Sequence, residues 1–136
     1  MQTNPEFYFQ YFNSLYTDRV NVTADLAPSY SGLGRDRLNF IARGFRKLGV
    51  HCKPIVLLRD PVKRIKSAVR FNLAGKHYQE SISTGETDFD RALEQYYLSE
   101  HCQLGTRYDI LLEDVIHVFG KANLYVGIYE NRFRRR

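Results

Sequence analysis

The feature that most constrains the fold is an uninterrupted apolar run at residues 54–58, Pro-Ile-Val-Leu-Leu, which ends at Arg59-Asp60-Pro61. A run this short and rich in β-branched residues is typical of a strand buried on both faces. Asp60 is a good helix N-cap, and Pro61 suits the first helical position because its missing N–H costs nothing there. The sequence therefore predicts a buried strand that leads directly into a helix ending near Leu73.

The remaining pattern alternates helices and strands. Helical spacing of apolar residues, or alternation of apolar and polar ones, predicts each element. Because strands separated by helices cannot form hairpins, we expect a mostly parallel sheet flanked by helices, an α/β fold within one domain spanning residues 1–136. The expected elements are an aromatic helix over 5–16, a strand over 20–26, helices ending at Gly49 and Gly120, a helix from Thr87 with Asp90 in a weak capping box, a helix beginning near Arg107, a strand over 124–128, and a mobile loop over 75–86.

Composition excludes several classes of protein. With 43% hydrophobic and 14% aromatic residues, the chain differs from disordered sequences. Its two cysteines cannot build a disulfide framework, and no apolar run approaches the length of a membrane span. These observations predict a cytoplasmic location.

The positive charge is concentrated in one segment. The chain has a formal net charge of +5, yet residues 35–70 alone carry eleven Lys or Arg against two Asp. Residues 71–130 carry four basic and ten acidic groups, and four arginines lie within the last six residues. This distribution favours a local anion site over a uniformly basic surface.

The predicted anion site lies where the buried strand meets its helix. Arg59 follows the strand's carboxyl end, and the first turn of the next helix presents backbone N–H groups and the positive end of the helix dipole. A guanidinium matches the geometry of phosphate oxygens. Ser67 follows about two helical turns later, and Arg64 shares its face. The alternative is that Arg59 pairs with a carboxylate and Ser67 is a solvated helix residue.

Three segments together resemble a known family. Residues 59–67, Arg-Asp-Pro-Val-Lys-Arg-Ile-Lys-Ser, resemble the Arg-Asp-Pro-x-x-Arg-x-x-Ser segment of sulfotransferases that use 3'-phosphoadenosine 5'-phosphosulfate (PAPS). Residues 25–30 resemble the Thr-Pro-x-Tyr turn of bacterial and heparan-type members, with alanine at the threonine position, and 108–130 fit a later part of the pattern. The resemblance implies a P-loop-NTPase-like core in which Arg59 and Ser67 bind the 3'-phosphate of PAPS.

The family's opening loop, Lys-x-Gly-Thr-Thr, has no counterpart here. Since that loop holds the 5'-phosphosulfate, we interpret the chain as a core truncated at both ends, whose catalysis depends on that loop being supplied. The resemblance implies sulfuryl transfer to a hydroxyl or amine acceptor such as a carbohydrate. A glutamate before a Phe-Phe pair serves as base in many members, and Glu6 matches it when aligned through Phe7 and Phe9, whereas alignment through Pro5 places Asn4 there. A first-turn acid favoured by the helix dipole is the other interpretation of Glu6.

Other functions have weaker signals. The pairs His51-Cys52 and His101-Cys102 lack the spacing of a zinc site, so no metal is predicted. The basic segment and Arg-rich tail keep open a second interpretation, a catalytically inactive module that binds nucleotides or nucleic acid. Nucleic acid is the less favoured partner, because the aromatic residues occupy helix-core spacing and do not alternate with basic ones.

Overall fold

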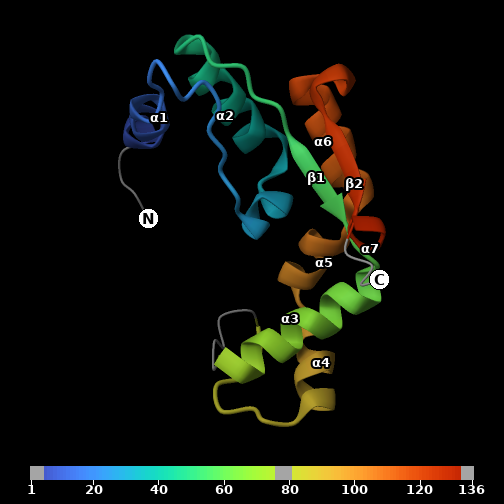
Figure 1. Ribbon diagram of the computed structural model, residues 1–136. Helices are drawn as coiled ribbons and strands as arrows, with labels where there is room; N and C mark the ends of the chain where they lie inside the picture. The colour runs from blue at the N-terminus through green and yellow to red at the C-terminus, as the bar shows by residue number, and fades with distance from the viewer. Residues whose placement is uncertain (1–4, 76–80, 133–136) are drawn as a thin grey trace.

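The computed structural model describes residues 5–75 and 81–132. This part of the chain is rich in helices and contains one small sheet (Figure 1). The elements, in chain order, are α1 (Pro5–Ser14), the 3-10 helix η1 (Pro28–Gly32), α2 (Gly34–Lys47), β1 (Ile55–Leu58), α3 (Pro61–Gly75), α4 (Phe89–Tyr97), α5 (Glu100–Thr106), α6 (Tyr108–Phe119), the 3-10 helix η2 (Lys121–Asn123), β2 (Tyr125–Ile128) and α7 (Tyr129–Arg132).

The two strands of the sheet are parallel, as the alternation of elements predicts. Ile55 is paired with Tyr125 and Leu58 with Ile128, so both strands end at the same edge. The connection between them contains α3, α4, α5 and α6. The described chain is therefore a helix-rich mixed structure with one small two-stranded parallel sheet, which agrees with the expected α/β class.

The strand expected over residues 20–26 does not form. Within the described part of the chain these residues have no strand partner, apart from one isolated bridge between Thr17 and Val20. The apolar side chains meant for a core point to solvent instead, with Val22 77% and Leu26 90% exposed. Alternation produces a strand only where a neighbouring strand supplies hydrogen bonds and a core covers the apolar face. Here the segment is held by Asp25, whose carboxylate accepts hydrogen bonds from the hydroxyls of Tyr8 and Tyr30.

Strand β1 is not buried on both faces, contrary to the expectation from its apolar run. Its burial alternates: Ile55 is 69% and Leu57 50% exposed, whereas Val56 and Leu58 are half-buried. A continuous apolar run predicts burial only if layers cover both faces of the sheet. In the described chain one set of these side chains is left facing solvent.

Local signals place most helix ends correctly. Asp60 caps α3, since its side chain accepts the Lys63 N–H at 3.0 Å. Gly49, at φ 74°, ends α2 with the paired hydrogen bonds Val50 N–H to Phe45 O and Gly49 N–H to Arg46 O of a Schellman motif.

Two details at the later helices differ from the prediction. The cap of α4 is Asp88, which accepts the Arg91 N–H at 2.8 Å, so the capping box expected from Thr87 and Asp90 is wrong. Helix α5 was not predicted, and it begins after Ser99, whose Oγ accepts the Cys102 N–H at 3.1 Å. In α4, Asp88 is the residue directly before the helix, so its carboxylate can accept the Arg91 N–H. Thr87 lies one residue too far from the first turn to do so, because an N-cap residue must directly flank the helix.

Two groups of buried residues organise the packing. One joins α3, α4 and α5 around Val69, Ala92, Tyr96 and Cys102, and Ile82 also belongs to it. The expected loop over 75–86 is thus anchored by a buried side chain at Ile82, and residues 76–80 lie outside the described residues.

No described helix has both the length and the apolar content that a membrane crossing requires.

The second group joins α1, α2 and α6. Tyr8, Phe9 and Phe12 pack their rings edge-on against Phe45 of α2 at centroid distances of 5.1–6.0 Å. Helix α6 lies on another side of α2. The two groups occupy the upper and lower parts of the molecule in Figure 1, and β1 with its following turn connects them.

Candidate functional site

Arg59 lies directly after β1, at the edge where both parallel strands end. Its guanidinium stacks over the ring of Tyr129, with Cζ 4.9 Å from the ring centroid. Tyr129 is the first residue of α7 and follows β2 without a gap. Because the strands are in register at Leu58 and Ile128, the next residue of each strand reaches the same place. Arg59 Nε is buried without a hydrogen-bond partner in the described structure.

Arg64 comes from the first turn of α3 and points toward α5. Its guanidinium occupies the space left by Gly105, where an added Cβ would lie 2.5 Å from Nη1 and 2.6 Å from Nη2. Arg64 Nη1 is also buried and, among the described residues, has no hydrogen-bond partner. Burial raises the pKa of the nearby Cys102 thiol, and the positive charge of Arg64 lowers it in part. Arg64 is therefore fixed by packing, with donor capacity to spare.

Two backbone N–H groups at the start of α3 donate hydrogen bonds to carboxylates of the protein itself. Glu130 Oε1 accepts the Asp60 N–H at 3.1 Å, and Asp60 Oδ1 accepts the Lys63 N–H. Pro61 has no N–H. The N–H groups of Asp60 and Lys63 are therefore engaged, so the start of the helix offers fewer free donors to an anion than expected. Among the described residues, the donors that remain here are the backbone N–H of Val62 and the guanidinium N–H groups of Arg59 and Arg64.

Ser67 lies on α3, three residues after Arg64 and half-buried. Side chains three apart on a helix are neighbours, so Ser67 and Arg64 share one surface of α3. Within the described residues, its hydroxyl forms no hydrogen bond to another group. The turn before α3 and its first two helical turns thus carry two buried nitrogens without partners, Arg59 Nε and Arg64 Nη1, and the half-buried hydroxyl of Ser67.

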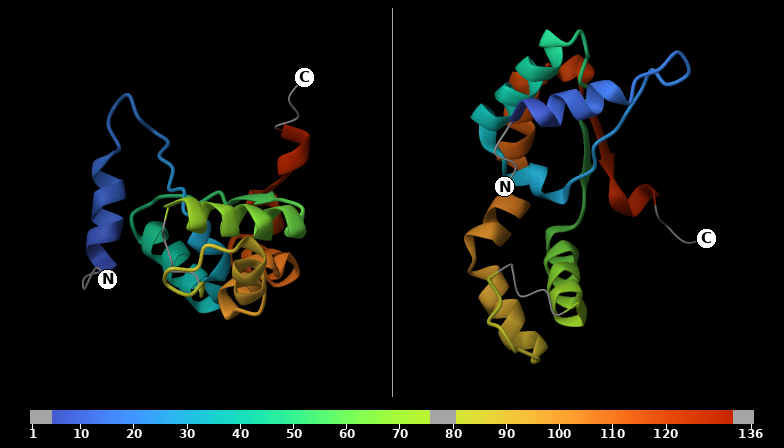
Figure 2. Two further views of the ribbon diagram at one scale, coloured as in Figure 1. Left: turned by 90° about the horizontal axis from the view of Figure 1, so that it is seen from below. Right: turned by 90° about the vertical axis from the view of Figure 1, so that its left-hand side faces the viewer.

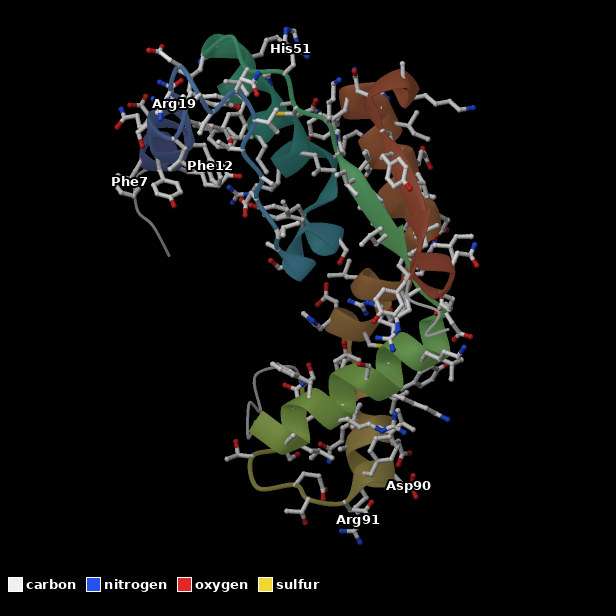
Figure 3. The ribbon with its side chains drawn as sticks, viewed as in Figure 1. Phe7, Phe12, Arg19, His51, Asp90 and Arg91 are labelled. Carbon is white, nitrogen blue, oxygen red and sulfur yellow. The ribbon has the colours of Figure 1, made fainter. Side chains whose placement is uncertain are left out.

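Glu6 is not brought to this surface. It lies in the first turn of α1, and Figures 1 and 2 place α1 on the opposite side of the molecule from the start of α3. In Figure 3 its neighbour Phe7 also lies at that far end, well away from β1. The predicted base therefore lies apart from Arg59, Arg64 and Ser67, which follow one another from the end of β1 into α3.

Three contributors to the site were not predicted as site residues: Tyr129, Glu130 and Gly105. Each comes from a segment more than forty positions away from Arg59 or Arg64 in the chain. The register of a parallel sheet could have indicated Tyr129 and Glu130, since residues that follow neighbouring strands meet at one edge. No local signal marks Gly105 as the residue that accommodates Arg64.

Neither a cluster of metal ligands in the described residues nor a known relative indicates a function for this site. Across residues 5–75 and 81–132, no three His, Cys, Asp or Glu side chains gather as metal ligands would. Comparison with protein-family models, curated proteins and solved structures finds no significant match to this chain.

Proposed function

We propose that this chain is part of a sulfotransferase-like nucleotide-binding core, which transfers a sulfuryl group from PAPS to a hydroxyl or amine acceptor such as a carbohydrate. Arg59, Arg64 and Ser67 are its 3'-phosphate ligands. Support comes from the position of Arg59 at the carboxyl end of a parallel strand, where α/β folds bind ligands, and from the Arg-Asp-Pro-x-x-Arg-x-x-Ser pattern around it.

The observation that carries the proposal is the pair of buried guanidinium nitrogens without partners, Arg59 Nε and Arg64 Nη1. Buried N–H groups without partners are rare because each forfeits the hydrogen bonds it made to water, at a cost of about 1–3 kcal/mol. Two of them at one helix start indicate a missing acceptor. A phosphate group carries several strong acceptor oxygens and matches the planar donor geometry of arginine.

In the proposed reaction the donor supplies an activated sulfuryl group. The bond between sulfur and the phosphate oxygen breaks, a bond from sulfur to the acceptor oxygen or nitrogen forms, and a base takes the acceptor's proton. The contribution of Arg59, Arg64 and Ser67 is to hold the nucleotide in register. Glu6 remains the proposed base on the strength of the resemblance alone, because α1 lies on the opposite side of the molecule from Arg59 and a base must come within hydrogen-bond reach of the acceptor.

Calorimetric titration with adenosine 3',5'-bisphosphate tests the nucleotide site. We expect binding that weakens by about 1.5–3 kcal/mol in Arg59→Ala, the range for hydrogen bonds to charged groups. Arg59→Lys should keep the charge and lose the planar donor pair, so the affinity of this variant should lie between those of the native chain and Arg59→Ala. Arg19→Ala, which removes an exposed arginine outside both proposed binding surfaces, is the matched control. Absence of binding by the native chain, or equal binding of adenosine 5'-monophosphate, contradicts the proposal.

A second candidate function rests on α2. Four exposed cations of this helix, Arg37, Arg43, Arg46 and Lys47, have no carboxylate within ion-pair distance in the described structure. The second candidate is a catalytically inactive module that binds nucleic acid through this face. Its affinity for an oligonucleotide should then fall steeply as the salt concentration rises. The triple variant Arg43→Gln, Arg46→Gln, Lys47→Gln should show a flatter salt dependence. The Arg-rich tail at 134–136 lies outside the described residues. Affinity independent of salt dismisses this function.

A further inference from the structure

An open groove of about 400 Å³ runs between α3 and α4. Its apolar lining comes from Val62 and Ile65 of α3 and from Leu93 and Tyr97 of α4. Ile65 and Leu93 pack against the core formed by α3, α4 and α5, so the floor is held by buried neighbours. Val62 and Tyr97 form the rims and are 58% and 62% exposed. The volume lies within the range of small-molecule sites.

The charges around the groove are unequal. Asp90 and Glu94 are four residues apart on α4 and therefore lie on one face, and Lys66 of α3 stands opposite. None of the three forms an ion pair within the described chain. Of the neighbouring basic residues, Arg91 projects from α4 in a different direction from Asp90 (Figure 3), and the guanidinium of Arg70 lies over the ring of Phe89, with Cζ 5.5 Å from its centroid. Among the residues that line the groove, two carboxylates against one ammonium give a net charge of about −1 at neutral pH.

We infer that this groove binds a small apolar molecule that carries one positive charge, such as an amine on an aromatic or aliphatic body. The apolar floor removes the body of the ligand from water, which is favourable in proportion to the area buried. The ammonium lies by Asp90 and Glu94, and the exposed ring of Tyr97 offers its negative face to the same cation. Lys66 repels a second positive charge and so limits the ligand to a monocation.

The ligand class can be tested with three probes of matched shape: 4-phenylbutylamine, 4-phenylbutan-1-ol and 4-phenylbutanoate. Each is titrated into the whole chain and followed through backbone amide chemical shifts. We expect the amine to shift the amides of Ile65 and Leu93 and to bind roughly three- to tenfold more tightly than the alcohol, since exposed ion pairs are each modest. The butanoate should bind most weakly.

Isosteric variants identify the source of selectivity. Asp90→Asn with Glu94→Gln should lower the affinity for the amine to that of the alcohol and leave the alcohol unchanged, while Asp36→Asn, which removes an acid of α2, should change neither. Raising the salt concentration on the native chain repeats the test without a mutation, because screening weakens only the charged probe. Absence of amine binding, or alcohol or butanoate binding as tightly as the amine, overturns the inference. Since no probe contains phosphate, these results are independent of the proposed nucleotide site.

Discussion

Replacing Gly105 with alanine should separate the effect of Arg64 on ligand binding from its effect on stability. The added Cβ would lie 2.5, 2.6 and 2.9 Å from Nη1, Nη2 and Cζ of Arg64, closer than real contacts allow. The guanidinium is the end of a flexible side chain, so it moves while the backbone of α5 stays. Arg64 keeps its charge and loses its position.

The two expected effects have opposite signs. Alanine is favoured over glycine in a helix by up to about 1 kcal/mol, so the free energy of unfolding should stay level or rise. An arginine N–H bonded to a phosphate contributes about 1.5–3 kcal/mol, of which a displaced but still charged guanidinium retains a part. We therefore expect adenosine 3',5'-bisphosphate binding to weaken by about 1 kcal/mol, roughly fivefold in Kd.

Calorimetry and urea unfolding on the same samples measure the two quantities. Gly32→Ala is the matched control, because a Cβ at Gly32 meets only Leu104 at an ordinary 3.8 Å. In an Arg64→Ala background, Gly105→Ala should have no further effect on binding. The reasoning is refuted if Gly105→Ala leaves binding unchanged in the native background, or if it destabilises the fold as much as it weakens binding.

Two further predictions concern the α1 region. Gly44→Ala places a Cβ within 2.1–2.5 Å of the ring of Phe9. The overpacking, about 1–3 kcal/mol, should exceed the gain in helix propensity and lower the unfolding midpoint in urea, and an unchanged midpoint would contradict the packing of α1 on α2. Burial, with the hydrogen bonds to Tyr30 and Asp25, raises the pKa of Tyr8. A raised phenol pKa stabilises the folded state below the unfolded value near 10, so stability should fall as pH rises above about 10, and Tyr8→Phe should reduce this slope.

Local chemistry in the sequence predicts the helix boundaries, because a cap acts within a few residues. Asp60 and Gly49 each carry their own signal, a carboxylate for an open N–H and a backbone able to adopt positive φ. Helix α5 was missed because seven residues are too few to show an apolar period. The segment over 20–26 has a clear strand pattern and no strand, since pairing depends on a partner that the pattern cannot supply.

In the candidate site, too, some residues can be predicted from local sequence and others only from tertiary contacts. Arg59, Arg64 and Ser67 are close in sequence, so spacing along one helix was sufficient to group them. Tyr129 and Glu130 join them only through the pairing of β1 with β2, and Gly105 only through the packing of α5 on α3. These contacts depend on tertiary structure, which fixes them without leaving a local mark.

The structure changes what the charge of the basic segment means. Much of the positive charge of residues 35–70 lies on α2, where Arg35 is paired with Asp114 at 2.8 Å. At the start of α3, the carboxylates of Asp60 and Glu130 offset two of the three charges of Arg59, Lys63 and Arg64, which leaves a net charge of only about +1 in the immediate surroundings. A phosphate would therefore be held there by the direction of buried guanidinium donors and only weakly by net charge. Binding of that kind should respond strongly to the geometry of Arg59 and Arg64 and modestly to salt, whereas binding to the unpaired cations of α2 should do the reverse.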